Sequence, residues 1–246
     1  MRRRFFVEQF SGGAATLSGQ AAHHLARVLR AETGQLYELS DGQTVCLARV
    51  ERIGRDSIDF AVVESLAAPA PRLDLTLLLA VVKFERFEWA LEKATELGVS
   101  TIVPLAAARS EKALLTAAPK RAVRWEKILL EAAQQARCLR PPALRTLTRP
   151  EQAFPADDSS IRILLSEQAG APRLKNVLDE KVLNRAILPP SPLHLSLAIG
   201  PEGGWTKAEL AAGQAAQFSA AALGGNILRT ETAVVAGLAA AHLYLD

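Results

Sequence analysis

The chain has 246 residues, 49% of them hydrophobic and 22% charged, which is ordinary for a globular protein. This length is enough for one large domain or two modest ones, each with its own core. The most apolar stretch, residues 232–245, is too short to span a membrane, and no apolar signal core follows the first arginines. The two cysteines and four histidines show no metal-ligand spacing. We therefore expect a reduced, cytoplasmic protein without a membrane segment or a metal.

The net charge of +3 is unevenly distributed. Residues 83–149 carry thirteen Lys and Arg against seven Asp and Glu, whereas residues 150–246 carry seven against ten. A basic middle section favours a surface that faces a polyanion. Solvated helix faces rich in Lys and Arg would give the same counts, so charge alone leaves both interpretations open.

The N-terminal part of the chain is predicted to be mostly β-structure. The β-prone runs are residues 4–7, 36–39, 45–52 and 58–63. One helix is predicted over residues 20–30, where an apolar stripe repeats at helical spacing. A small, mostly antiparallel barrel is the expected result, followed by a short Pro- and Ala-rich linker at residues 66–71.

From residue 73 onward, strands alternate with helices. The predicted strands are residues 75–82, 99–105 and 161–166, and the predicted helices are residues 84–97 and 121–137. Continuous apolar runs are typical of strands buried on both faces, so a mostly parallel sheet is expected. Residues 150–160 and 170–192 are predicted to be loops, the second with some helix.

Two glycine turns near the C-terminus each follow an apolar strand-like run. Residues 193–199 lead into Gly-Pro-Glu-Gly-Gly at 200–204, and residues 218–223 lead into Gly-Gly-Asn at 224–226. Thr206 and Glu209 form a capping box after the first turn, and Thr230 is placed to cap the final helix. Turns of this kind build small-molecule clefts in open α/β sheets. Neither turn is a dinucleotide or P-loop fingerprint.

Several segments together resemble the bacterial small-subunit rRNA uracil-N3 methyltransferases (RsmE family). The matching segments are residues 24–30, 93–99, 109–110, 131–135, 200–204 and 228–233. The resemblance covers nearly the whole chain, in order. It implies an α/β protein with a SPOUT methyltransferase domain over residues 73–246, built on a mostly parallel sheet, and a small PUA-like RNA-binding β-barrel over residues 1–70. It also implies a C-terminal trefoil knot, a homodimer, and methylation of N3 of a uridine in the decoding region of 16S rRNA with S-adenosylmethionine.

S-adenosylmethionine carries a positive sulfonium, so methyl transfer needs positioning more than bond polarisation. Main-chain groups at the glycine turns and apolar walls suit its adenine and methionine parts. The residues expected to bind it are Leu165, Gly200, Pro201, Glu202, Gly203, Leu223, Gly224, Ile227, Leu228, Thr232 and Ala233. The competing interpretation is two ordinary tight turns, with Glu202 merely bracing the first.

Two residues are candidates for the catalytic role. Uracil N3 must lose a proton before or during attack, so the site needs a base or a group that stabilises the uracil anion. We expect Arg229 to stabilise charge on a uracil oxygen and Glu231 to orient the base or accept the proton. A structural role, with Glu231 as a first-turn acid and Arg229 as its partner, is the alternative.

RNA binding is expected to rest on phosphate contacts from basic side chains. The candidates are Arg27, Arg30, Lys83, Arg86, Lys93, Arg109, Arg137 and Arg140. Each could also be a solvated surface charge. Aromatic residues make up 5% of the chain, so a base-stacking platform is not expected, and the target is folded rRNA or the assembled small subunit with the uridine extruded.

Two other functions remain open from the residues alone. A nucleotide-binding oxidoreductase could use the same sheet, but no dinucleotide fingerprint or ribose-binding acid is in place. An RNA-binding assembly factor would use the barrel and the basic helices without using the cleft.

Overall fold

A computed structural model of the chain describes residues 3–68, 71–157, 159, 161–168, 170–183 and 192–245, with the side chains of 182 and 183 excepted. The chain divides into two compact units. The first comprises Met1–Pro69 and Leu130–Pro141, and the second comprises Ala70–Leu129 and Pro142–Asp246. The short segment 130–141 therefore belongs with the N-terminal residues, although it lies far along the sequence.

The first unit contains a curled five-stranded sheet in the order β1-β3-β4-β5-β2. Its strands are β1 (Arg4–Phe6), β2 (Ala14–Ser18), β3 (Leu36–Ser40), β4 (Val45–Ile53) and β5 (Ser57–Leu66). The pairings are antiparallel except for β1 with β3, and the register shifts twice between β4 and β5. Such shifts bend and twist a strand pair, which curls the sheet around a core that includes Phe5 and Phe60. Strand β2 is an addition to the predicted elements.

The predicted helix over residues 20–30 is shorter and changes form midway. It consists of α1 (Gly19–His23) followed by a π-helical segment, η1 (His24–Val28). The amide of Leu29 donates to the carbonyl of His24 (3.1 Å), and the backbone then turns at Arg30, whose φ is +52°. Leu25 is fully buried in the core of this unit. The predicted apolar stripe includes Leu25, but its member Val28 is 65% exposed, because the wider π-helical turn changes the helical period.

The first unit also holds the end of a long helix, α3 (Lys112–Ala136). Arg4 donates through Nη1 to the carbonyls of Arg137 (2.6 Å) and Cys138 (3.3 Å) just beyond the helix. The carboxylate of Glu38 pairs with Arg4 (3.1 Å) and with Arg137 (3.4 Å). Because these carbonyls end the helix and lack helical partners, the arginine of β1 satisfies them. These contacts explain why residues 130–141 group with the N-terminal sheet.

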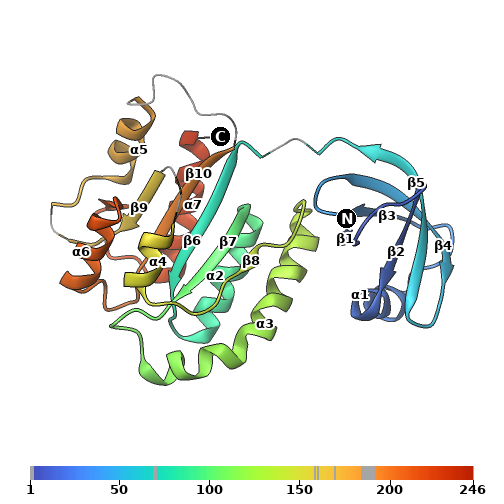
Figure 1. Cartoon of the computed structure of the whole chain (residues 1–246), viewed down its shortest axis with the longest axis horizontal. Helices are drawn as coiled ribbons and strands as arrows, with labels where there is room; N and C mark the ends of the chain where they lie inside the picture. Colours follow the sequence, from blue (N-terminus) through green and yellow to red (C-terminus); the bar gives the residue numbers. More distant parts are fainter. Residues whose placement is uncertain are drawn as a thin grey trace. The chain divides into compact units, whose positions relative to one another are not determined.

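The second unit is built on a six-stranded sheet in the order β11-β9-β10-β6-β7-β8 (Figure 1). The strands are β6 (Leu73–Ala80), β7 (Val99–Leu105), β8 (Ala143–Leu144), β9 (Ile161–Leu165), β10 (Leu193–Ile199) and β11 (Ser219–Ala221). Every pairing between these strands is parallel. The apolar runs in the sequence predict this arrangement, because strands covered on both faces need apolar residues at every position.

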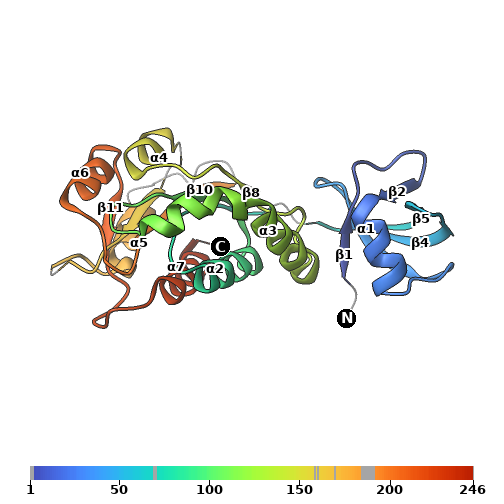
Figure 2. The ribbon, with the colours of Figure 1, turned by 90° about the horizontal axis from the view of Figure 1, so that it is seen from below.

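Helices cover both faces of this sheet (Figure 2). Besides α3, they are α2 (Phe84–Glu96), α4 (Pro150–Ala156), α5 (Leu174–Leu183), α6 (Lys207–Ala215) and α7 (Thr230–Leu245). Leu75, Leu77 and Leu79 of β6 face a core shared with α2, α3, α5 and α7. Leu78 and Ala80 face the opposite core, which α4 and α6 complete. None of the described helices combines the length and apolar character that crossing a bilayer requires.

Several predicted boundaries in this unit are wrong, among them those of β6, which covers residues 73–80 rather than 75–82. Helix α3 begins at Lys112 rather than at residue 121, and it continues through Pro119. Proline removes one amide donor, but the packing of Ala118 and Trp125 into the core holds the helix together. Residues 150–156 form α4 where a loop is predicted, because Pro150 occupies the first helical turn, where its fixed φ favours a helix.

Helix α7 packs closely against β10 at Gly237. A Cβ atom placed on Gly237 would lie 2.7 Å from Cδ2 of Leu197 and 3.4 Å from Cδ1 of Leu165. We expect Gly237→Val to lower the free energy of unfolding by about 1–3 kcal/mol through overpacking. Urea denaturation measures this change. Val123→Gly, at a position of α3 that is 77% exposed, measures the difference in helix propensity between the same two residues, and a Gly237→Val variant that is more stable than the parent by this difference would contradict the packing explanation.

Candidate active site

A cavity of about 660 Å³ lies where β9, β10 and β11 end. Its lining comes from the segments that follow these three strands, together with Arg109 from the loop after β7. The strands are parallel and neighbouring, so their carboxyl ends meet at one edge of the sheet. This edge is where open α/β sheets bind small molecules.

The first glycine turn, residues 200–204, packs against the indole of Trp205. A Cβ atom on Gly200 would lie 3.0 Å from the indole, so this position has no room for a side chain. The indole Nε1 donates to the carbonyl of Leu165 at the end of β9 (2.8 Å). Arg109 donates through Nη1 to the carbonyls of Gly203 (2.7 Å) and Trp205 (3.3 Å). The turn is therefore held by the indole of the residue that follows it and by Arg109 of the loop after β7.

The start of α6 is held by a buried glutamate. The predicted capping box is confirmed: Thr206 accepts from the amide of Glu209, and Glu209 accepts from the amide of Thr206. The other carboxylate oxygen of Glu209 accepts from the amide of Ala108 (2.8 Å). Since Glu209 is fully buried, this one side chain links the loop after β7 to the helix that follows the first turn.

The segment that holds the second glycine turn, residues 222–228, is hydrogen-bonded to the segment after β9 and to the first turn. The amide of Leu174 donates to the carbonyl of Ala222 (2.9 Å), and the amide of Ala222 donates to the carbonyl of Pro172 (2.8 Å). The hydroxyl of Thr230 donates to the carbonyl of Gly200 (3.3 Å). Thr230 is the first residue of α7, and its hydroxyl connects the two turns.

The predicted cofactor-binding residues are gathered at this cavity. Leu165, Gly200, Pro201, Glu202, Gly203, Leu223, Gly224, Ile227, Leu228 and Ala233 all line it. Thr232 does not, whereas Thr230 does. Residues three apart share a helix face, so Thr230 and Ala233 point to the cavity together and Thr232 points elsewhere.

The predicted catalytic pair is not an ion pair. Arg229 is exposed just before α7, and Glu231 has a side chain that is 15% exposed. Oε1 of Glu231 lies 3.8 Å from Nε of Arg86, and the described residues contain no ion pair between Arg229 and Glu231. The alternative structural role, with Arg229 as the partner of Glu231, therefore has no described ion pair behind it, because α2 packs beside α7 and supplies Arg86 instead. Neither Arg229 nor Glu231 is among the residues that line the cavity.

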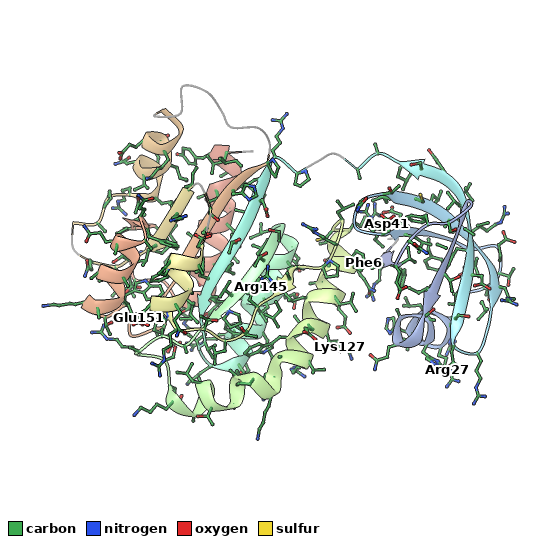
Figure 3. The ribbon with its side chains drawn as sticks, viewed as in Figure 1. Phe6, Arg27, Asp41, Lys127, Arg145 and Glu151 are labelled. Atoms are coloured by element: carbon green, nitrogen blue, oxygen red, sulfur yellow. The ribbon has the colours of Figure 1, made fainter. Side chains whose placement is uncertain are left out.

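The eight predicted RNA-binding residues fall into three kinds. Arg27, Arg30, Lys83, Arg137 and Arg140 are exposed, and Figure 3 labels Arg27 on the helical segment of the first unit. Arg86 and Arg109 are engaged at the cavity. Lys93 donates to Glu92 (2.7 Å) and Glu96 (2.8 Å), and these hydrogen bonds raise the pKa of Lys93 above its ordinary value.

The sequence did not single out two residues of this site. Trp205 is buried against the first turn. Its position directly after Gly203 and Gly204 is the sequence feature that could indicate its role in the site. Arg173 lines the cavity, with Nη1 3.8 Å from a Cβ placed on Gly224. A single arginine between a proline and a leucine carries no recognisable pattern. Among the described residues, no group of three His, Cys, Asp or Glu is arranged to hold a metal ion.

The cavity suits a ligand that combines an apolar ring with polar edges. Leu165, Leu223, Ile227 and Leu228 supply apolar surface, and Ile227 is 79% exposed at the rim. The glycine turns present peptide N–H and C=O groups without side chains in the way. These features fit adenine and methionine groups, which main-chain donors and acceptors recognise.

Comparison with known proteins agrees with this geometry. The sequence model of the RNA methyltransferase domain family matches residues 69–242. The sequence model of the RNA methyltransferase PUA domain family matches residues 17–63. Ribosomal RNA small subunit methyltransferase E of Mycobacterium bovis is 34% identical over 244 residues, covering 96% of this chain and 89% of the relative. The enzyme of that name from Synechocystis is 31% identical over 242 residues, covering 97% and 76%.

Solved structures are similar over the whole length. Ribosomal RNA small subunit methyltransferase E from Neisseria gonorrhoeae, bound to S-adenosyl methionine, superposes with a TM-score of 0.83 at 27% identity, covering 99% of this chain and 98% of that one. A methyltransferase from Legionella pneumophila in complex with the same cofactor gives 0.82 at 26% identity, with the same coverage. The chain therefore belongs to the ribosomal RNA small subunit methyltransferase E family.

Proposed function

We propose that the protein transfers the methyl group of S-adenosylmethionine to N3 of a uridine in the decoding region of 16S rRNA. The observation that carries this proposal is the cavity at the ends of β9, β10 and β11, lined by two glycine turns and an apolar wall. Family membership and the cofactor named in two similar structures support it. A dinucleotide-dependent oxidoreductase has no such support, because the turns lack the fingerprint that holds a pyrophosphate.

Different cavity residues bind different parts of the methyl donor. Peptide groups at residues 200–204 and 223–228 recognise the polar edges, and Leu165, Leu223 and Leu228 enclose the ring. When bound, S-adenosylmethionine supplies a methyl group on a positively charged sulfur. The chain then has to orient this group toward the uracil and exclude water, and the fixed turns favour both. Glu202 braces the first turn through its ion pair with Arg86.

Arg229 is the residue that we assign to the uracil. It is exposed at the start of α7, next to Leu228 and Thr230 of the cavity lining, so it can reach a base presented at the mouth. A guanidinium there stabilises the negative charge that develops on a uracil oxygen as N3 releases its proton to solvent at the mouth of the cavity. For Glu231, geometry favours an orienting role over proton acceptance, since its Oε2 is closed to solvent and lacks a hydrogen-bond partner among the described residues.

The substrate side of the proposal rests on the basic residues. We assign residues 1–70 as a PUA-like RNA-binding barrel domain and residues 73–246 as the SPOUT methyltransferase domain. Exposed Arg27, Arg30 and Lys83 suit phosphate contacts. Arg137 and Arg140, near the end of α3, suit the same role. The uridine is presented by folded rRNA or by the assembled small subunit, and the enzyme works in the cytoplasm.

We also propose a C-terminal trefoil knot and a homodimer. The sheet order supports the knot, because β10 is inserted between β9 and the much earlier β6. For the dimer, the support is exposed apolar surface on two helices that pack together. Trp89 of α2 is 43% exposed, and Leu243 and Tyr244 of α7 are 86% and 37% exposed. Large apolar side chains exposed together are typical of interaction sites.

Mass spectrometry of 16S rRNA tests the proposed function. In a strain that lacks the gene, we expect one methyluridine of the decoding region to disappear, and a plasmid copy of the parent chain to restore it. Retention of every methyluridine would contradict the proposal. An RNA-binding assembly factor would then be favoured, and a subunit-assembly defect with unchanged methylation would identify it.

A further inference from the structure

Arg86 connects the two glycine-turn segments of the cavity, a role that the sequence does not indicate. It lies in the first turn of α2, where its amide donates to the carbonyl of Lys83 (2.9 Å). Nη1 of its guanidinium contacts Oε1 of Glu202 in the first turn. Its Nε lies 3.8 Å from Oε1 of Glu231, which follows Thr230 in the first turn of α7, just beyond the second glycine turn. One cation thus serves two carboxylates that are far apart in the sequence.

The local electrostatics make this arrangement dependent on Arg86. The positive end of the α2 dipole disfavours a cation in the first helical turn, so Arg86 is stabilised there by its carboxylate partners. The described ion pairs include no second cation for Glu202 or for Glu231. The side chain of Glu231 is only 15% exposed. Removing the cation would leave two neighbouring carboxylates, one of them largely buried, without compensation.

The position of the cavity wall depends on the same contacts. Glu202 lines the cavity, and the hydroxyl of Thr230 already holds Gly200 from the α7 side (3.3 Å). Arg86 supplies a second link between the same two segments, through Glu202 and Glu231. Two links fix the separation of the two turns, whereas without Arg86 that separation depends on the Thr230 hydroxyl alone.

We infer that Arg86 is a positioning residue that holds the two glycine turns at the separation the methyl donor requires, and that it does so by neutralising Glu202 and Glu231. This inference rests on the proposed function, since it concerns the same cavity. It differs from the sequence hypothesis for Arg86, in which the guanidinium contacts an RNA phosphate.

Calorimetry with S-adenosylmethionine on a double-mutant cycle tests the inference. We expect Arg86→Met to raise the Kd about 10- to 100-fold in the parent chain, because displaced binding groups lose affinity steeply. In a Glu202→Gln, Glu231→Gln background the carboxylates no longer need a cation, so adding Arg86→Met should change the Kd less than about threefold. An equal effect in both backgrounds, or no effect in the parent, would overturn the inference.

Further measurements separate the competing roles. At saturating cofactor, we plot the logarithm of the KM for rRNA against the logarithm of the salt concentration. Arg86→Met should keep the slope of the parent in this plot, whereas loss of a phosphate contact would reduce the slope by about 1. Arg124→Met is the matched control, because Arg124 pairs with Glu88 of α2 (2.9 Å) away from the cavity. If Arg86→Met does not fold, Arg86→Lys in the same two backgrounds provides the cycle, with a smaller Kd increase expected in the parent only. Failure of the parent itself to bind S-adenosylmethionine would instead count against the proposed function.

Discussion

Arg229→Ala should lower kcat for methyl transfer about 10²- to 10³-fold, the range found when one group that stabilises a developing negative charge is removed. Arg229 is exposed next to the cavity but does not line it, so the Kd for S-adenosylmethionine should stay at the parent value. Single-turnover assays at saturating cofactor and rRNA measure the rate of the chemical step. Charge stabilisation acts on that step, so the loss should appear in kcat rather than in cofactor affinity.

Two comparisons make the Arg229 experiment decisive. Arg229→Lys keeps the positive charge but loses the planar fork of donors, so it should recover part of the rate. Arg145→Ala removes a cation from the segment after β8 and should leave kcat unchanged (Figure 3). If Arg229→Ala transfers methyl groups as fast as the parent, Arg229 has no part in the chemical step.

Trp205→Ala should destabilise the second unit by about 3–5 kcal/mol, the usual cost of emptying a buried aromatic site. Trp205 is 7% exposed, its ring lies 5.8 Å from that of Phe154, and its indole leaves no room for a Cβ atom at Gly200. Its loss removes the support of the first turn, so we also expect binding of S-adenosylmethionine to become undetectable. Urea denaturation and calorimetry measure the two effects.

Trp205→Phe separates the packing of the ring from its hydrogen bond. Phenylalanine retains much of the volume but leaves the carbonyl of Leu165 without the indole donor, which costs about 1–3 kcal/mol. We expect this variant to bind the cofactor with reduced affinity. Parent-like stability in Trp205→Ala would show that the first turn does not depend on the indole.

The sequence predicts the second unit well wherever burial dictates the residue pattern. Strand β7 is predicted at its observed bounds, and β9 within one residue, because strands covered on both faces show continuous apolar runs. Glycine turns and the capping box of Thr206 and Glu209 are also found, since local backbone geometry restricts the residue types there. The same local rules locate most of the cavity lining.

Other features depend on contacts between distant segments, which the sequence does not reveal. Strand β2 reads Ala-Ala-Thr-Leu-Ser, a weak β pattern that becomes a strand by pairing with β5. The partner of Glu231 is Arg86, more than a hundred residues earlier, because α2 and α7 pack side by side. No spacing rule connects these two positions. Likewise, Arg4 donates to the carbonyl of Arg137 beyond the end of α3, and it can do so because residues 130–141 group with the N-terminal sheet.

Calorimetric titration of the parent protein with S-adenosylmethionine, and separately with NAD, tests the account most directly. The cavity between the glycine turns should give one saturable site per chain for S-adenosylmethionine and no heat of binding for NAD. Absence of binding to S-adenosylmethionine, or saturable binding of NAD instead, would contradict the assignment of this cavity to a methyl donor.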